Sequence, residues 1–293
     1  MTLLDERICT LGEGALWHPD RQELFWFDIT GRRLLSRRPN GGGREWALSE
    51  MCSAAARIDG NRLLIASETA LSVFDIEAGR IVRRLAWLEA GETGNRSNDG
   101  RADPWGGFWI GTMGKAAEPG AGAIYRCFGG RVERLVESVT IPNAICFSPD
   151  RRHAYYADTA LGQIFRVGLD AGGWPVGAGE LFIDLGLLGF APDGAVTLND
   201  GSLMVALWGE GAVLMVSADG EAGARIPLPA PHLTCPAMGG PDFSTLFCTS
   251  ATEGLSAEEL ARAPLSGATF RRDTPFRGRP EPAFDLTPFG DPA

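Results

Sequence analysis

Short apolar runs separated by polar turns recur along the chain, and six segments share one pattern. In each, an apolar strand, a turn rich in Pro, Asp, Asn or Gly, and a second apolar strand follow one another. Asp and Asn accept turn dihedrals, Pro presets one and Gly allows positive φ, so the pattern predicts β-hairpins. The segments are ALWHPDRQELFWFD (15–28), AARIDGNRLLIAS (55–67), RADPWGGFWIGTM (101–113), AICFSPDRRHAYYAD (144–158), AVTLNDGSLMVAL (195–207) and AMGGPDFSTLFCTS (237–250).

Successive hairpins begin about 40–50 residues apart, a period typical of propeller blades with four strands each. Further apolar runs supply third strands, namely ALSVFD (70–75), AIYRCF (123–128), GQIFRV (162–167) and AVLMVS (212–217). The best helical candidate is short, SAEELARA (256–263), with Ser256 as N-cap and Glu259 at the capping-box position. An irregular β-sandwich is the alternative, but the regular spacing favours a propeller. We therefore predict an all-β chain: a single domain, residues 1–293, forming a six-bladed β-propeller with four-stranded blades.

Composition narrows the range of partners. The chain has 293 residues and a formal net charge of −10, which disfavours nucleic acid phosphates and anionic lipid as partners. Six cysteines occur without a C-x-x-C pair, and the N-terminus lacks a basic stretch followed by an apolar core. We expect reduced thiols, a cytoplasmic location, and a monomer or weak homo-oligomer that binds neither membrane nor nucleic acid.

Four oxygen-bearing side chains stand at equivalent places, each just before a predicted inner strand. They are Glu13 in GEG, Asn98 in SNDG, Asn143 in PNA and Asp193 in PDG. Because the inner strands of a propeller surround a central channel, these side chains should converge on one axis. Carboxylate and amide oxygens suit a hard cation such as Ca²⁺, Mg²⁺ or Mn²⁺.

Taken alone, each of these residues is more often a turn former than a ligand. We interpret Asp99 as a turn residue or a support behind the ligands, and Asp103 as a turn residue. The three histidines form no ligand motif, which disfavours a His-based zinc site. The chain also lacks a G-x-S-x-G nucleophile elbow and a phosphate-binding loop.

Four longer stretches carry a family resemblance. They are LGEGALWHPDRQELFWFDITGRRL, NRSNDGRADPWGGFWIGTM, IPNAICFSPDRRHAYYADT and PDGAVTLNDGSLMVALWGEGAV. Through them the chain resembles the gluconolactonase/SMP-30 (regucalcin) family, as a bacterial sugar lactonase, from about Leu11 to about Thr269. The resemblance implies a six-bladed propeller with a divalent metal at one end of its channel.

The resemblance also implies roles for individual residues. Glu13, Asn143 and Asp193 match the positions that coordinate the metal, and Asp193 is in addition the candidate general base. Asn98 matches a residue that lies beside the metal and contacts substrate or metal-bound water, so it is both a catalytic and a substrate-binding candidate. Arg96 matches an arginine that contacts substrate hydroxyls.

One position departs from the family pattern. Animal members carry a sugar-binding Glu shortly after G-T-M, where this chain has Ala116, and Glu118 two residues later is our candidate replacement. Two interpretations apply to Trp17, Trp109 and Trp208, lining of the channel mouth and packing between blades, and we favour packing for each.

The implied activity is metal-dependent hydrolysis of sugar lactones, such as glucono-, xylono-, arabinono- or galactonolactone, to the aldonic acids. The implied cofactor is one divalent cation, Ca²⁺ first, with Zn²⁺, Mn²⁺, Mg²⁺ and Fe²⁺ as alternatives. Two other functions remain open: a calcium-dependent aryl esterase or organophosphatase, and a calcium-binding propeller without enzymatic activity.

Overall fold

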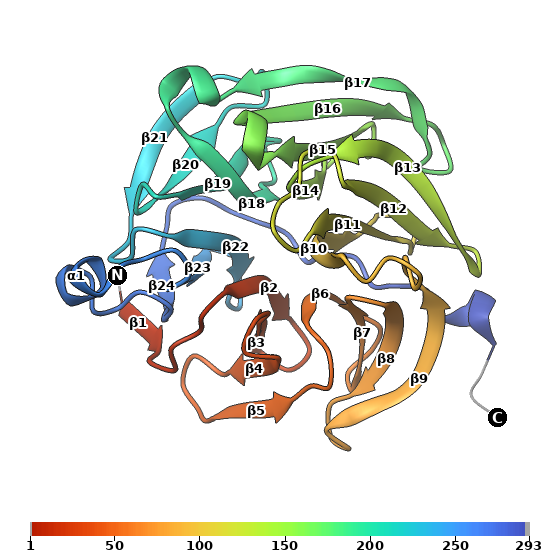
Figure 1. Cartoon of the computed structure of the whole chain (residues 1–293), viewed down its shortest axis with the longest axis horizontal. Helices are drawn as coiled ribbons and strands as arrows, with labels where there is room; N and C mark the ends of the chain where they lie inside the picture. The colour runs from red at the N-terminus through yellow and green to blue at the C-terminus, as the bar shows by residue number, and fades with distance from the viewer. Residues whose placement is uncertain (1, 291–293) are drawn as a thin grey trace.

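Six antiparallel sheets surround a central axis in the computed structural model, which describes residues 2–290 (Figure 1). Within five of the sheets the strands pair in chain order, from the innermost to the outermost. The six innermost strands contact one another around the ring. The predicted six-bladed β-propeller with four-stranded blades is therefore confirmed.

The first five blades use strands that are consecutive in the chain, and their bounds are as follows. They are β2 (Gly12–His18), β3 (Glu23–Asp28), β4 (Arg33–Arg37) and β5 (Gly43–Ala47); β6 (Cys52–Arg57), β7 (Arg62–Ser67), β8 (Ala70–Asp75) and β9 (Arg80–Trp87); β10 (Asn95–Ala102), β11 (Phe108–Gly114), β12 (Gly122–Phe128) and β13 (Arg131–Val139); β14 (Pro142–Phe147), β15 (His153–Asp158), β16 (Gln163–Leu169) and β17 (Pro175–Asp184); β18 (Ala191–Thr197), β19 (Leu203–Trp208), β20 (Ala212–Val216) and β21 (Ala222–Pro227).

The sixth blade joins the two ends of the chain. It combines β22 (Leu233–Gly239), β23 (Thr245–Ser250) and β24 (Thr269–Asp273) with β1 (Thr2–Asp5) as its outermost strand. Figure 1 shows the N-terminal strand beside β24. The hairpin pattern does not predict β1, because TLLD is short and its partner lies at the other end of the chain. Pairing of the first and last strands closes the ring.

Apolar side chains fill each interface between neighbouring blades. Six buried clusters occur among the described residues, one at each interface. Successive side chains of a strand point to opposite faces, so one strand serves two interfaces. In β3, Trp26 packs toward the sixth blade, whereas Phe25 and Phe27 pack toward the second. The alternating pattern of each blade therefore holds both of its neighbours in place.

Helical structure is sparse, as predicted. Among residues 2–290 one α-helix, α1 (Ala257–Arg262), lies in the loop between β23 and β24. Ser256 caps it, and Glu259 completes the capping box, which confirms the predicted cap. Single turns of 3₁₀ helix are found at η1 (Thr159–Leu161), η2 (Gly186–Leu188) and η3 (Thr287–Phe289).

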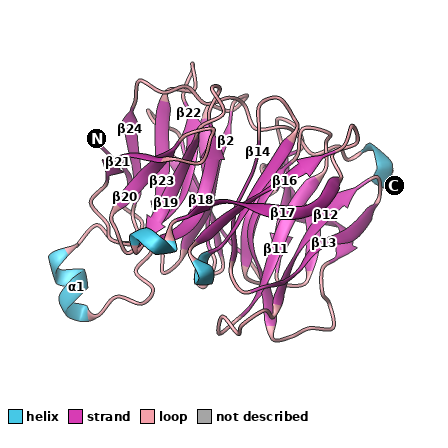
Figure 2. Ribbon diagram, turned by 90° about the horizontal axis from the view of Figure 1, so that it is seen from above, coloured by secondary structure: helices cyan, strands magenta, loops and turns pink. Residues whose placement is uncertain are grey.

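The C-terminal segment, residues 274–290, crosses the ring from β24 to the η3 turn (Figure 1). The amide of Phe284 donates to the carbonyl of Arg57, at the end of an inner strand, over 2.8 Å. Nη1 of the buried Arg101 donates a hydrogen bond to Oε1 of Glu281 over 2.5 Å, and the two side chains form an ion pair. Seen from the side, α1 and the η3 turn lie at opposite faces of the ring (Figure 2). This segment therefore closes the end of the channel opposite the starts of the inner strands.

Candidate metal centre and active site

An irregularity in pairing occurs near the start of each inner strand that carries a predicted site residue. The register shifts fall between Glu13 and Leu16, Ser97 and Gly100, Asn143 and Cys146, and Pro192 and Ala195. A bulge locally frees one strand from its neighbour and re-aims its side chains. These bulges turn Glu13, Asn98, Asn143 and Asp193 toward the axis.

Backbone geometry explains part of the G-E-G motif. Gly14 has a φ of 62°, a left-handed conformation that glycine adopts without strain. A Cβ at this position would lie 2.2 Å from the carbonyl oxygen of Ser53, so no larger residue fits. The Gly14 amide also donates to Oε2 of Glu13 over 3.1 Å. The second glycine thus both forms the bulge and fixes the preceding carboxyl.

A chain of hydrogen bonds positions the two amide side chains. Nη1 of Arg96 donates to Oδ1 of Asn98 over 2.7 Å, and Nδ2 of Asn98 donates to Oδ1 of Asn143 over 2.9 Å. Nδ2 of Asn143 donates in turn to the Thr159 hydroxyl over 2.8 Å. Because the nitrogen of Asn143 is bonded to Thr159, its oxygen faces the other site residues.

Glu13 and Asp193 form a buried carboxyl pair, 7% and 4% exposed. Burial raises the pKa of Glu13 to about 8, and the nearby charge of Asp99 adds to the shift. Burial, followed by the charge of Glu13, raises the pKa of Asp193 well above its usual value. The two carboxyl groups therefore affect each other's protonation. The pair therefore keeps a proton near neutral pH unless a positive charge replaces it.

A divalent cation fits this donor set. Two carboxyl groups and the amide oxygen of Asn143 are oxygen donors of the kind that hard cations prefer. The charge of a cation would remove the repulsion that keeps the carboxyl pair protonated. Within residues 2–290 no group of three or more His, Cys, Asp and Glu side chains could hold a metal, so a cation held here would have the Asn143 amide oxygen beside the two carboxyl groups.

The site opens into a cavity of about 400 Å³. Five of the predicted site residues line it, namely Glu13, Arg96, Asn98, Asn143 and Asp193. Arg96 is only 8% exposed, and within residues 2–290 it donates hydrogen bonds through Nη1 alone. The rest of its guanidinium is therefore available to a bound molecule.

Glu118 lies outside this cavity. It is exposed, and its Oε2 accepts a hydrogen bond from the backbone amide of Ala116 over 3.1 Å. Its carboxylate stabilises the turn between β11 and β12, so the geometry does not support a substrate-binding role for Glu118. Ala116 itself lines the cavity but offers no side-chain donor or acceptor.

Several cavity residues were not predicted. Three of them lie on the connections between second and third strands of the blades, namely Lys115, Thr159 and Glu253, and Trp208 is the last residue of the second strand β19. These connections reach the same face as the starts of the inner strands, and that common position is the signal that could have located them. Both interpretations hold for Trp208, which packs against the cluster between the first two blades and also lines the cavity, where it stacks on His232 at 4.0 Å. The packing prediction holds for the other two tryptophans, Trp17 and Trp109, which are buried.

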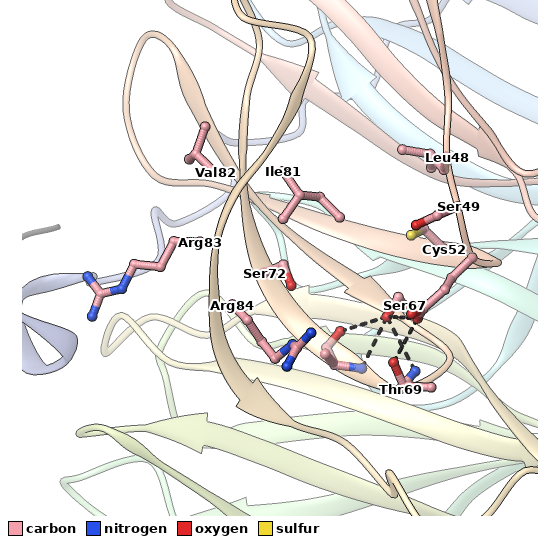
Figure 3. Close-up of a pocket in the computed structure, with 12 residues that line it drawn as sticks. Leu48, Ser49, Cys52, Ser67, Thr69, Ser72, Ile81, Val82, Arg83 and Arg84 are labelled. Atoms are coloured by element: carbon pink, nitrogen blue, oxygen red, sulfur yellow. Dashed lines mark hydrogen bonds between the residues drawn. The ribbon is translucent and has the colours of Figure 1, made fainter.

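A second pocket, of about 360 Å³, lies in the second blade (Figure 3). Its polar side chains bond one another: Oε2 of Glu50 accepts from the hydroxyls of Ser67 and Thr69, both over 2.7 Å. Arg83 points away from the pocket and bonds the carbonyl of Gly290 over 2.6 Å. With its carboxylate, Glu50, already paired, this pocket is a weaker candidate than the axial cavity.

No helix within residues 2–290 has the length and apolar character needed to cross a membrane.

The fold and the site together define a class, a six-bladed propeller with an oxygen-lined, cation-compatible cavity on its axis. The chain belongs to the SMP-30/gluconolactonase/LRE-like family, whose model matches residues 11–252. It is 35% identical to a 6-deoxy-6-sulfogluconolactonase of Pseudomonas putida, over 94% of each chain. It is 34% identical to an L-arabinolactonase of Azospirillum brasilense, covering 99% of this chain and 97% of that one.

A solved structure is also similar. A calcium-binding protein, regucalcin, from Agrobacterium tumefaciens shares 42% identity with this chain. The two superpose with a TM-score of 0.94 over 97% of each chain.

Proposed function

We propose that this protein hydrolyses sugar lactones to aldonic acids with the help of one divalent cation. The observation that carries the proposal is the convergence of Glu13, Asn143 and Asp193 in one cavity with Arg96 and Asn98. A cavity of about 400 Å³ suits a ligand the size of a monosaccharide. The chain belongs to the SMP-30/gluconolactonase/LRE-like family and is similar to a 6-deoxy-6-sulfogluconolactonase and an L-arabinolactonase, and this supports the same class of substrate.

Glu13, Asn143 and Asp193 are the proposed cation ligands. Their oxygens favour Ca²⁺, with Mg²⁺, Mn²⁺, Zn²⁺ and Fe²⁺ as alternatives. A cation bound there supplies positive charge that polarises the lactone carbonyl and compensates the two carboxylates. The supporting similarity to a calcium-binding regucalcin concerns the fold and most of the chain.

Asp193 is the proposed general base. In its ionised form it takes a proton from the attacking water while the water oxygen bonds to the lactone carbonyl carbon. The acyl C–O bond of the ring then breaks, and Asp193 returns the proton to the departing ring oxygen. One lactone and one water thus give one hydroxy acid, and the carboxylate is regenerated.

Arg96 and Asn98 are the proposed substrate-positioning residues. Nη1 of Arg96 is held by Asn98 and by the carbonyl of Ser97, over 2.7 and 2.9 Å. This leaves the other guanidinium nitrogens to donate to substrate hydroxyls in a fixed direction. Holding the lactone in one orientation lowers the entropic part of the barrier.

The test measures acid release from glucono-, xylono-, arabinono- and galactonolactone, beside paraoxon and phenyl acetate, with and without chelator. We expect chelator-sensitive hydrolysis of one or more sugar lactones only. Faster turnover of paraoxon or phenyl acetate would favour the aryl esterase or organophosphatase function. Cation binding without any turnover would favour a calcium-binding protein that is not an enzyme.

Three other expectations stay predictions. The single domain 1–293 includes residues 1 and 291–293, which lie outside the described residues. The cytoplasmic location is a prediction, and so is a monomer or weak homo-oligomer without nucleic acid or membrane partners.

A further inference from the structure

A carboxylate that none of the proposed catalytic steps uses lies on the wall of the axial cavity. Glu253 belongs to the connection between β23 and β24, in the sixth blade. Its side chain is exposed and makes no hydrogen bond to any of residues 2–290. A carboxylate oxygen that is unpaired in a ligand cavity is free to accept hydrogen bonds from a ligand.

The backbone of Glu253 is held firmly although its carboxylate is free. Its amide donates to the carbonyl of Thr10 over 2.9 Å. Its carbonyl pairs with Nδ1 of His232 over 2.8 Å, and the His232 ring stacks on Trp208 at 4.0 Å. Trp208 lines the same cavity. The carboxylate is therefore presented from a fixed point on the cavity wall.

Arg96 and Glu253 both line this cavity. Burial lowers the pKa of Arg96, and among the carboxylates that oppose this shift Glu253 acts most strongly. Yet the ion pairs formed within residues 2–290 include none between Arg96 and Glu253, which leaves a gap between the two charges. A sugar hydroxyl can fill such a gap, because it accepts from a guanidinium and donates to a carboxylate at the same time.

The other charges at the cavity rim do not replace Glu253. Lys115 pairs with Glu68 at 2.6 Å and donates to the carbonyl of Thr93 over 3.0 Å. Its charge is thus compensated by a residue outside the cavity lining. Glu253 is left as the one acidic wall residue outside the proposed cation ligands, among the described residues that line the cavity.

We propose that Glu253 is a specificity-determining residue that binds a hydroxyl of the lactone together with Arg96 and disfavours lactones carrying an anionic group. This inference rests on the proposed lactonase function. It assigns to Glu253 the sugar contact that Ala116 cannot make. The substrate class is then a neutral, polyhydroxylated lactone.

Two variants at Glu253 and one matched control test the proposal. Glu253→Gln removes the charge with little change of size, and Glu253→Ala removes the acceptor. Glu258→Gln makes the same charge change in the same connection, on the exposed helix α1. Kinetics are measured on a neutral aldonolactone, its deoxy analogues, and D-glucaro-1,4-lactone, whose free carboxylate makes it anionic. Calorimetry with Ca²⁺ follows cation binding by each variant.

We expect Glu253→Ala to raise KM for the neutral lactone about 10- to 100-fold, the range of one hydrogen bond to a charged group, with kcat changed by less than about threefold. For the deoxy analogue that lacks the hydroxyl bound by Glu253, wild type and Glu253→Ala should have the same KM. Glu253→Gln should lower KM for the anionic lactone about two- to fivefold by removing repulsion. Glu258→Gln should match wild type throughout.

Three results would overturn the inference. Unchanged KM values in both Glu253 variants would do so while leaving the lactonase proposal intact. A loss of Ca²⁺ binding in Glu253→Gln would show that Glu253 is a cation ligand instead. A wild-type protein that hydrolyses none of the lactones would overturn the proposed function itself, and this inference with it.

Discussion

Glu281 is predicted to stabilise the ring by neutralising a charge buried on the propeller axis. Arg101 is 6% exposed, and its Nε and Nη2 donate to the carbonyls of Ile145 and Ala195, both over 2.8 Å. These bonds prevent the guanidinium from moving out into water. Burial alone would lower the pKa of the Arg101 guanidinium. Nearby groups, of which Glu281 acts most strongly, more than offset this effect, so the pKa is raised above its ordinary value. The substitution Glu281→Ala should leave this charge largely uncompensated.

The size of the effect follows from the burial. Removing one partner of a buried ion pair costs about 3–5 kcal/mol. Asp99 lies close enough to Arg101 to compensate part of the remaining charge, so we expect about 3 kcal/mol. With an unfolding entropy of about 2 cal/mol/K per residue, this corresponds to a melting temperature lower by about 5 °C.

Differential scanning calorimetry of the cation-saturated protein measures this shift. Asp285→Ala is the control in the same segment, because its carboxylate is exposed and accepts from the amide of Thr287 alone. It should lower the melting temperature by less than about 2 °C. The double variant Arg101→Met, Glu281→Leu should recover most of the loss, since no charge is then left buried. A Glu281→Ala protein that melts with the control would refute this reasoning.

Three further predictions concern the site. Asp193→Asn should lower kcat by about 10²- to 10⁴-fold in an acid-release assay. If the variant turned over lactone at the full rate while calorimetry showed that it still binds the cation, Asp193 would not be the base. Arg96→Ala should raise KM about 10- to 100-fold with kcat little changed. An equal fall in kcat and kcat/KM would instead show that Arg96 stabilises the transition state and does not contribute to substrate binding. The cation-free protein should lose stability as pH rises from about 4.5 to about 8. The pKa of Glu13 is raised in the folded state, so over this range the folded state binds more protons than the unfolded chain, and raising the pH favours unfolding. Chelator should therefore lower the melting temperature more at pH 8.5 than at pH 6, and an equal drop at both would contradict the carboxyl pairing.

The fold could be predicted because its signal is local and repeated. Each hairpin carries its own turn residues, and the predicted third strand 70–75 coincides with β8. The strand β1 and the C-terminal segment could not be predicted, since each depends on partners far along the chain. Thr2 pairs with Arg271, and Glu281 with Arg101.

The site residues likewise fall into two groups, those marked by a local motif and those that only the folded chain brings together. The starts of the inner strands are marked by short motifs, and the structure brings Glu13, Asn98, Asn143 and Asp193 into one cavity. Glu253, on a connection, and Trp208, at the end of β19, are marked by no repeated motif, and only the assembled ring shows that they line the cavity. Glu118 illustrates the converse, because nearness in sequence to a family position did not place its carboxylate in the cavity.

Removal and return of the cation tests the central claim most directly. Protein stripped with chelator and dialysed is titrated with Ca²⁺ while hydrolysis of its preferred lactone is followed, with the spontaneous rate subtracted. The account predicts no enzymatic hydrolysis without the cation and full recovery at one equivalent per chain, with Glu13→Gln requiring far more. Full activity in the stripped wild-type protein would contradict it.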